Sequence, residues 1–180
     1  MSGRVVGIVG RSGTGKTTLI EALLPRLRAR GLTVSTVKHT HHSVDIDPPG
    51  KDSRRHRDAG AQEVLLVSER RWALMRETPS APAPLSELLA RLAPVDIVLV
   101  EGFGRTFGTR LELVRADVAV RRGKQPLFLD DPGIDAVASD SDVPEWRGTL
   151  LDLNNPDAIC DWIAALPHPS DHPLLSWTRG

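Results

Sequence analysis

The stretch Val5-Val6-Gly7-Ile8-Val9 runs directly into Gly10-Arg11-Ser12-Gly13-Thr14-Gly15-Lys16-Thr17. The first five residues are mostly β-branched and apolar on both faces, which is typical of a buried strand in a parallel sheet. The next eight match G-x-x-x-x-G-K-[ST], the phosphate-binding P-loop, at every fixed position. The sequence therefore predicts a strand, a phosphate-binding loop and a helix in that order.

The chemistry of the loop explains its spacing. Glycines let the backbone curl so that several N–H groups face one anion, and the following helix adds the positive end of its dipole. Lys16 is expected to reach the β- and γ-phosphates as a catalytic cation, and the Thr17 hydroxyl to ligate Mg²⁺. The glycines do not form G-x-G-x-x-G, which disfavours a dinucleotide-binding Rossmann domain. The predicted nucleotide-binding residues here are Gly10, Arg11, Ser12, Gly13, Thr14, Gly15, Lys16, Thr17 and Thr18.

The pattern after the loop predicts a βαβ unit. Leucines at positions 19, 23 and 27 give a helical face. Pro25 is expected to kink this helix or loosen one turn of it, and Gly31 to end it. A second strand follows over 32–37. Asn155 and Pro156 predict the start of a last helix, because they supply a side-chain cap and a proline at the first helical position. Further elements are predicted over 52–59 and 85–92 (helices), over 63–67 with 72–75 (a hairpin), and over 96–100, 111–114, 126–129 and 134–138 (strands).

These elements predict an α/β class of fold: a three-layer P-loop nucleotide-binding fold. Its sheet is mostly parallel with an antiparallel hairpin, and helices cover both faces. We expect one P-loop nucleotide-binding domain over residues 1–167 and a loosely ordered tail over 168–180, which has two prolines, Pro169 and Pro173, in its first half.

An acidic residue ends the second strongly apolar strand, where Glu101-Gly102 follows Asp96–Val100. A carboxylate at the carboxyl end of a central strand lies beside the P-loop, where it can hold the Mg²⁺ shell or orient a water. We therefore assign Glu101 a catalytic and metal-binding role. The alternative is an acid that only caps the next turn.

A polar stretch follows the second strand, beginning Lys38-His39-Thr40-His41-His42. Asp45 or Asp47 is a candidate for the Mg²⁺ shell. His39 and His41 share a face if the strand continues, so they could bind a transition metal. Contacts to a polar ligand and a solvated loop are the alternatives. The candidate cofactor or partner contacts in and after this stretch are His39, His41, Lys51, Asp52, Arg54 and Arg57.

A late strand ends at Ser139-Asp140. The base of a nucleotide usually lies near such a strand end, and Asp140 there could accept two N–H bonds from guanine. The alternative is a turn acid. The chain contains no N-K-x-D motif, so no motif demonstrates GTP preference.

Composition narrows the class of protein. The 180 residues carry no net charge, which argues against a non-specific nucleic-acid binder. The first 90 residues hold 14 basic and 9 acidic side chains, so that half is the better candidate for an anionic ligand. The single cysteine, Cys160, allows no internal disulfide. No apolar run reaches the ~20 residues of a membrane helix, and no signal peptide is recognisable, so we expect a cytoplasmic protein.

Taken together, these residues resemble the MobB family, the molybdopterin-guanine dinucleotide biosynthesis proteins B. The resemblance is carried by the P-loop, by the histidine-rich stretch with Gly50-Lys51-Asp52-Ser53 after it, and by Val100-Glu101-Gly102-Phe103. It continues through Asp58-Ala59-Gly60-Ala61 and the late Leu151–Pro156, and spans the chain to about Leu166. Gly104 stands where many relatives would have a lysine.

The resemblance implies a GTP- and Mg²⁺-dependent homodimer with weak GTPase activity. Such a protein would assist the partner enzyme that attaches GMP to molybdopterin, and molybdopterin itself is a candidate ligand. Because no catalytic glutamine is evident, Arg11, Arg54 or Arg57 could supply catalytic charge across the dimer. The rivals are a small-molecule kinase, a metal-delivery GTPase using His39 and His41, and an adaptor in which hydrolysis has no role.

Overall fold

A computed structural model of the chain describes residues 3–40, 46–78, 81–104, 108–118 and 123–168. The chain divides into two compact units, Met1–His39 with Leu85–Gly180, and Thr40–Pro84. The predicted extent of one domain, 1–167, stays a prediction, and the tail from residue 169 lies outside the described residues. Within the described ranges, no helix combines the length and the apolar character needed to span a membrane.

The first unit contains a six-stranded sheet in the order β2-β5-β1-β6-β7-β8, and every pairing in it is parallel. β1 lies inside the sheet between β5 and β6, and both of its faces are also covered: Val6 and Ile8 pack in one apolar cluster, and Val9 packs in another. This explains the unbroken apolar run from which the strand was predicted. The strands are β1 (Arg4–Val9), β2 (Val34–Lys38), β5 (Ile97–Glu101), β6 (Thr109–Val114), β7 (Ala136–Ser139) and β8 (Thr149–Asp152).

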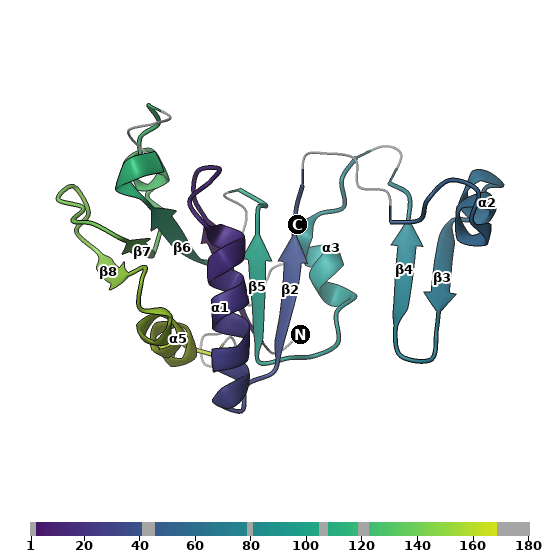
Figure 1. Cartoon of the computed structure of the whole chain (residues 1–180), viewed down its shortest axis with the longest axis horizontal. Helices are drawn as coiled ribbons and strands as arrows, with labels where there is room; N and C mark the ends of the chain where they lie inside the picture. Colours follow the sequence, from purple (N-terminus) through teal and green to yellow (C-terminus); the bar gives the residue numbers. More distant parts are fainter. Residues whose placement is uncertain (1–2, 41–45, 79–80, 105–107, 119–122, 169–180) are drawn as a thin grey trace. The chain divides into compact units, whose positions relative to one another are not determined.

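Helices cover both faces of this sheet. Helices α1 (Lys16–Ala29) and α5 (Pro156–Ala165) lie on one face and pack on each other (Figure 1). Helix α3 (Leu85–Ala90) packs its buried leucines against Val98 and Val100 on the other. The predicted α/β P-loop fold with a mostly parallel sheet is confirmed.

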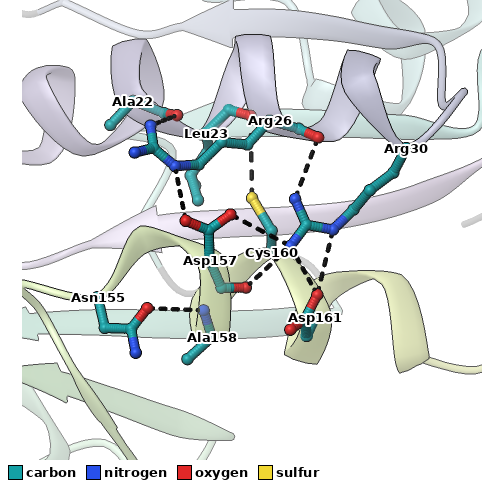
Figure 2. Close-up of polar contacts among 9 residues, drawn as sticks. All are labelled: Ala22, Leu23, Arg26, Arg30, Asn155, Asp157, Ala158, Cys160 and Asp161. Atoms are coloured by element: carbon teal, nitrogen blue, oxygen red, sulfur yellow. Dashed lines mark hydrogen bonds and ion pairs between the residues drawn. The ribbon is translucent and has the colours of Figure 1, made fainter.

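The contact between α1 and α5 is apolar at its centre and charged at its rim. Leu23 and Cys160 are both fully buried there, and the thiol lies 3.9 Å from the Leu23 carbonyl oxygen. Figure 2 shows Arg30 reaching across to Asp161 at 2.7 Å, with Arg26 and Asp157 beside them. Burial raises the pKa of the Cys160 thiol above its ordinary value, so the thiol stays protonated.

The second unit is a helix followed by a two-stranded hairpin. Helix α2 (Asp52–Asp58) precedes β3 (Glu63–Val67) and β4 (Trp72–Arg76), which pair antiparallel as predicted. Arg57 of α2 forms an ion pair at 2.6 Å with Asp47, whose carboxylate is buried. The hairpin also carries large apolar side chains that are exposed in the described structure: Leu65, Leu66, Val67, Trp72 and Leu74.

The structure differs from the sequence predictions at two places. Pro126–Leu129 was expected to be a strand, but Leu127–Leu129 is a 3₁₀ turn, because the backbone N–H groups of Leu127 and Phe128 donate to the Glu112 carboxylate and not to a neighbouring strand. Thr149–Asp152 is an edge strand that was not predicted. The first helix runs as one helix through Pro25, as predicted, with Leu23 and Leu27 fully buried on either side, and the local distortion expected at Pro25 stays a prediction.

Candidate functional site

The P-loop connects β1 to α1 with a backbone that requires glycine. Gly10, Gly13 and Gly15 all have positive φ angles, of 141°, 89° and 88°. A Cβ on Gly10 would lie 2.7 Å from the Leu113 carbonyl oxygen, so this position is also sterically closed. Gly15 precedes the first turn of α1 and offers no side-chain cap, which leaves the first N–H groups of the helix available to an anion.

Lys16 lies folded back over its own loop. Its Nζ donates to the carbonyl oxygens of Gly10 and Arg11 at 2.9 and 3.0 Å. Burial lowers the pKa of Lys16, the Glu101 carboxylate partly opposes that shift, and Lys38 adds to it. The ammonium group thus stands at the loop where phosphate oxygens are expected.

Thr17, Glu101 and Lys38 meet at the carboxyl edge of the sheet. Lys38 and Glu101 are direct partners in the parallel register of β2 and β5. The Thr17 hydroxyl lies 3.2 and 3.3 Å from the two Glu101 carboxylate oxygens. Lys38 Nζ lies 3.3 Å from Thr17 Oγ1 and 3.5 Å from Glu101 Oε2. Lys38 was not among the predicted site residues, although its place directly after a predicted strand was a usable signal.

His39 continues this edge. Its backbone N–H donates to the Glu101 carbonyl oxygen at 2.8 Å, and its ring packs on Phe103 with centroids 4.8 Å apart. Gly102 makes that approach possible, because a Cβ there would lie 2.8 Å from His39 Cβ. The structure therefore brings His39 next to Glu101, while His41 lies outside the described residues.

At the late strand, Asp140 is bound by an arginine that sequence reasoning missed. Asp140 Oδ2 accepts from Arg115 Nη1 at 3.0 Å, and Oδ1 accepts from the backbone N–H of Ala116 at 3.3 Å. Arg115 Nε donates to the P-loop carbonyl oxygen of Thr14 at 3.0 Å. Arg115 directly follows the strand predicted over 111–114, which was the available signal.

Further hydrogen bonds attach the segment after Gly123 to the P-loop and to β6. Arg11 Nε donates to the Gln125 carbonyl oxygen at 3.0 Å. Glu112 of β6 is buried and accepts the N–H groups of Leu127 and Phe128 at 2.6 and 2.9 Å. Burial raises the pKa of Glu112, and the two N–H bonds oppose that shift. In the sequence, the charged Glu112 within an otherwise apolar predicted strand was the signal for such a buried contact.

The remaining predicted residues belong to the second unit or lie outside the described ranges. Asp47 is bound to Arg57, and Arg57 also contacts Glu77. Arg54 pairs with Asp58 at 2.9 Å. Lys51 and Asp52 are exposed at the start of α2, and Asp45 is outside the described residues. Among the residues that the structure describes, no group of three or more His, Cys, Asp or Glu side chains could hold a metal ion.

Comparisons with known proteins show the family of this chain. The family profile described as "Molybdopterin guanine dinucleotide synthesis protein B" (MobB) matches residues 5–140. The molybdopterin-guanine dinucleotide biosynthesis adapter protein of Haemophilus influenzae is 41% identical over 161 residues, covering 88% of this chain and 86% of the relative. The protein of the same name from Escherichia coli is 42% identical over 156 residues, covering 84% and 86%.

Solved structures extend this similarity to the fold. A crystal structure of molybdopterin-guanine biosynthesis protein B superimposes with a TM-score of 0.69 at 28% identity, covering 91% of this chain and 99% of that one. The similarity therefore reaches well beyond the P-loop.

Proposed function

Because this chain belongs to the MobB family, whose members serve the synthesis of molybdopterin guanine dinucleotide, we propose that it works there as a GTP-binding adapter. The accessory role follows from the family and from the names of the relatives. The observation that carries the nucleotide part is the meeting of the P-loop, the Thr17 hydroxyl and the Glu101 carboxylate at one edge of the sheet. That edge is where ligands bind in open α/β sheets.

In this proposal the phosphates bind to the P-loop backbone and the N-terminus of α1. Gly10, Gly13 and Gly15 have the positive φ angles that let a loop backbone curl around an anion. Lys16, now bonded to two loop carbonyl oxygens, would exchange them for phosphate oxygens. Ser12 and Thr18 are exposed beside this path.

The residues present fit a magnesium ion. Hard divalent cations prefer oxygen ligands, and the Thr17 hydroxyl and Glu101 carboxylate place such oxygens within 3.3 Å of each other. Magnesium, when bound, would neutralise charge on the phosphates. Asp47 is held in a buried ion pair with Arg57, so Glu101 is the acidic ligand we propose.

Guanine is assigned to Asp140 at the end of β7. Its carboxylate could accept the N1–H and the exocyclic N–H of guanine, a pair that adenine does not offer. To do so, Asp140 would release bonds that it now makes with Arg115 and Ala116.

Hydrolysis is proposed to be slow. Lys16 and Glu101 are the groups placed to stabilise phosphate charge and to orient a water. Each arginine considered as a source of additional charge already has a partner: Arg11 with Gln125, Arg54 with Asp58, and Arg57 with Asp47. A homodimer, an enzyme that transfers GMP to molybdopterin, and molybdopterin itself are the proposed partners. His39, Lys51 and Asp52 are the proposed contact residues.

Titration calorimetry with GTP and with ATP, each with Mg²⁺, tests this function. We expect GTP binding that is lost in Lys16→Ala and retained in Arg28→Ala. Arg28 is an exposed cation on the same helix, about 18 Å along its axis. A preference for ATP, with phosphate transferred to an added acceptor and not to water, would favour the kinase. A stoichiometric zinc or nickel site lost in the His39→Ala, His41→Ala double variant would favour metal delivery.

A further inference from the structure

The edge of the sheet contains a cation that the P-loop motif does not account for. Lys38 belongs to β2, whereas Thr17 belongs to α1 and Glu101 to β5. The parallel register pairs Lys38 with Glu101, and its ammonium group lies within 3.5 Å of both the Glu101 carboxylate and the Thr17 hydroxyl. These are the same two oxygen-bearing groups to which we assign magnesium.

The two lysines of the site have separate places. Lys16 is bonded to the loop carbonyl oxygens of Gly10 and Arg11, so its ammonium group is committed to the loop. Lys38 is the cation bonded to the Thr17 hydroxyl, and it contributes to lowering the pKa of Lys16 by charge repulsion. The side chain of Lys38 is 59% exposed and that of Glu101 is 14% exposed, so the lysine is free to swing outward while the carboxylate is fixed.

We propose that Lys38 is a built-in competitor of the divalent cation. In the structure its ammonium group pairs with Glu101 and donates to Thr17, and it must leave these oxygens before a metal ion can bind them. The phosphate oxygens of the incoming nucleotide would attract the metal ion and would also bind the displaced ammonium group. This inference rests on the proposed function, because it takes Thr17 and Glu101 as the metal ligands.

The proposal makes Lys38 responsible for a measurable coupling. Without magnesium, Lys38 supplies part of the positive charge that a nucleotide needs, so removing it weakens metal-free binding. With magnesium, the Lys38→Met variant no longer has an ammonium group that competes with the metal ion. The substitution should therefore weaken nucleotide binding less than it does without magnesium. The gain in nucleotide affinity on adding Mg²⁺ is therefore expected to increase in Lys38→Met.

The experiment is calorimetric titration of GDP, which is not consumed, in EDTA and in excess MgCl₂. The quantity of interest is the dissociation constant in EDTA divided by the dissociation constant in MgCl₂, which measures the gain in affinity that Mg²⁺ brings. We expect Lys38→Met to raise this ratio about threefold or more, as one unit charge beside a carboxylate can produce. Lys38→Arg, which keeps the charge, is expected to stay near the wild-type ratio. Thermal melting of each variant establishes that it is folded.

Arg28→Met is the matched control, because it removes one positive charge from an exposed position of the same unit. If it raised the ratio as much as Lys38→Met, the effect would be one of overall charge, and the proposal would be wrong. A ratio unchanged or lowered in Lys38→Met, in a protein whose wild type responds to Mg²⁺, would overturn this inference alone. No GDP binding by the wild type, or none that responds to Mg²⁺, would overturn the proposed nucleotide or metal site and this inference with it.

Discussion

Arg115 and Asp140 form an ion pair at 3.0 Å between the ends of β6 and β7, and the same guanidinium group donates to the P-loop carbonyl oxygen of Thr14. One arginine thus connects the loop proposed for phosphates with the acid proposed for the base. Each side chain is about one-quarter to one-third exposed, so the pair is accessible to a ligand.

The first prediction concerns base selection by Asp140. We expect Asp140→Asn to weaken GTP binding about tenfold, because hydrogen bonds to an ionised acceptor are worth about 1.5–3 kcal/mol. ATP binding is expected to change much less. Competition titration with the two nucleotides measures both. Asp142→Asn, an exposed acid two residues further on, serves as the control, and equal losses for GTP and ATP would remove Asp140 from base recognition.

The second prediction concerns the closed space at Gly10. A methyl group there would meet the Leu113 carbonyl oxygen at 2.7 Å and require a φ of 141° from an L-residue. We expect Gly10→Ala to destabilise the protein by about 1–3 kcal/mol and to abolish nucleotide binding. Gly31→Ala shares the positive φ but meets nothing within 4 Å, so it should cost less in urea unfolding and leave binding intact. Equal effects of the two substitutions would contradict the steric argument.

The third prediction separates the apolar centre of the α1–α5 contact from its charged rim. Leu23 is fully buried, so Leu23→Ala should lower the free energy of unfolding by about 2–5 kcal/mol. Asp161 is 69% exposed although it lies 2.7 Å from Arg30, and exposed ion pairs contribute little. Asp161→Ala is therefore expected to leave the urea midpoint almost unchanged. A larger effect at Asp161 than at Leu23 would show that the rim holds these helices together.

The fourth prediction is a pH dependence from Glu112. Its pKa is raised in the folded protein by burial, so the folded state binds a proton more tightly than the unfolded state does. Stability from this group is therefore full below the unfolded pKa of about 4.3 and is lost as pH rises toward the folded pKa. Glu112→Gln removes this titration. We expect wild type to lose stability relative to Glu112→Gln as the pH rises above about 4.3, measured by urea unfolding at a series of pH values. A difference that does not vary with pH would refute the assignment.

Local signals predicted the elements that depend on neighbouring residues. The Asn155 side chain accepts from the Ala158 N–H at 3.2 Å, with Pro156 at the start of the helix, as the sequence indicated. The strand predicted over 126–129 was wrong because the acceptor that decides its conformation, Glu112, comes from a strand 15 residues earlier. Pattern reasoning within a window has no access to that partner.

Only part of the site was predictable, because a local sequence pattern reveals contiguous residues but not partners that are distant in the sequence. The P-loop is contiguous, so its glycines, Lys16 and Thr17 could be assigned together. Lys38 and Arg115 acquire their places through the register of non-consecutive strands, since β2 pairs with β5 and β6 with β1. Lys38 and Arg115 directly follow predicted strands, which suggested that they lie at the edge of the sheet. The sequence did not show which oxygen atoms they would contact. The roles assigned to Asp140 and Glu101 stay predictions.

The order of strands in the sheet also sets the order in which this protein can acquire structure. β1 has as neighbours β5 and β6, which begin at Ile97 and Thr109, and the whole second unit is inserted before either of them. Pairing β1 with β5 and β6 closes a long loop of chain. This slows folding, because the entropy of loop closure is lost before the strand contacts stabilise the structure. A nascent chain therefore carries a complete P-loop sequence well before it has the strands that fix it. Synthesis must proceed to about Val114 before both strands that pair with β1, β5 and β6, are present.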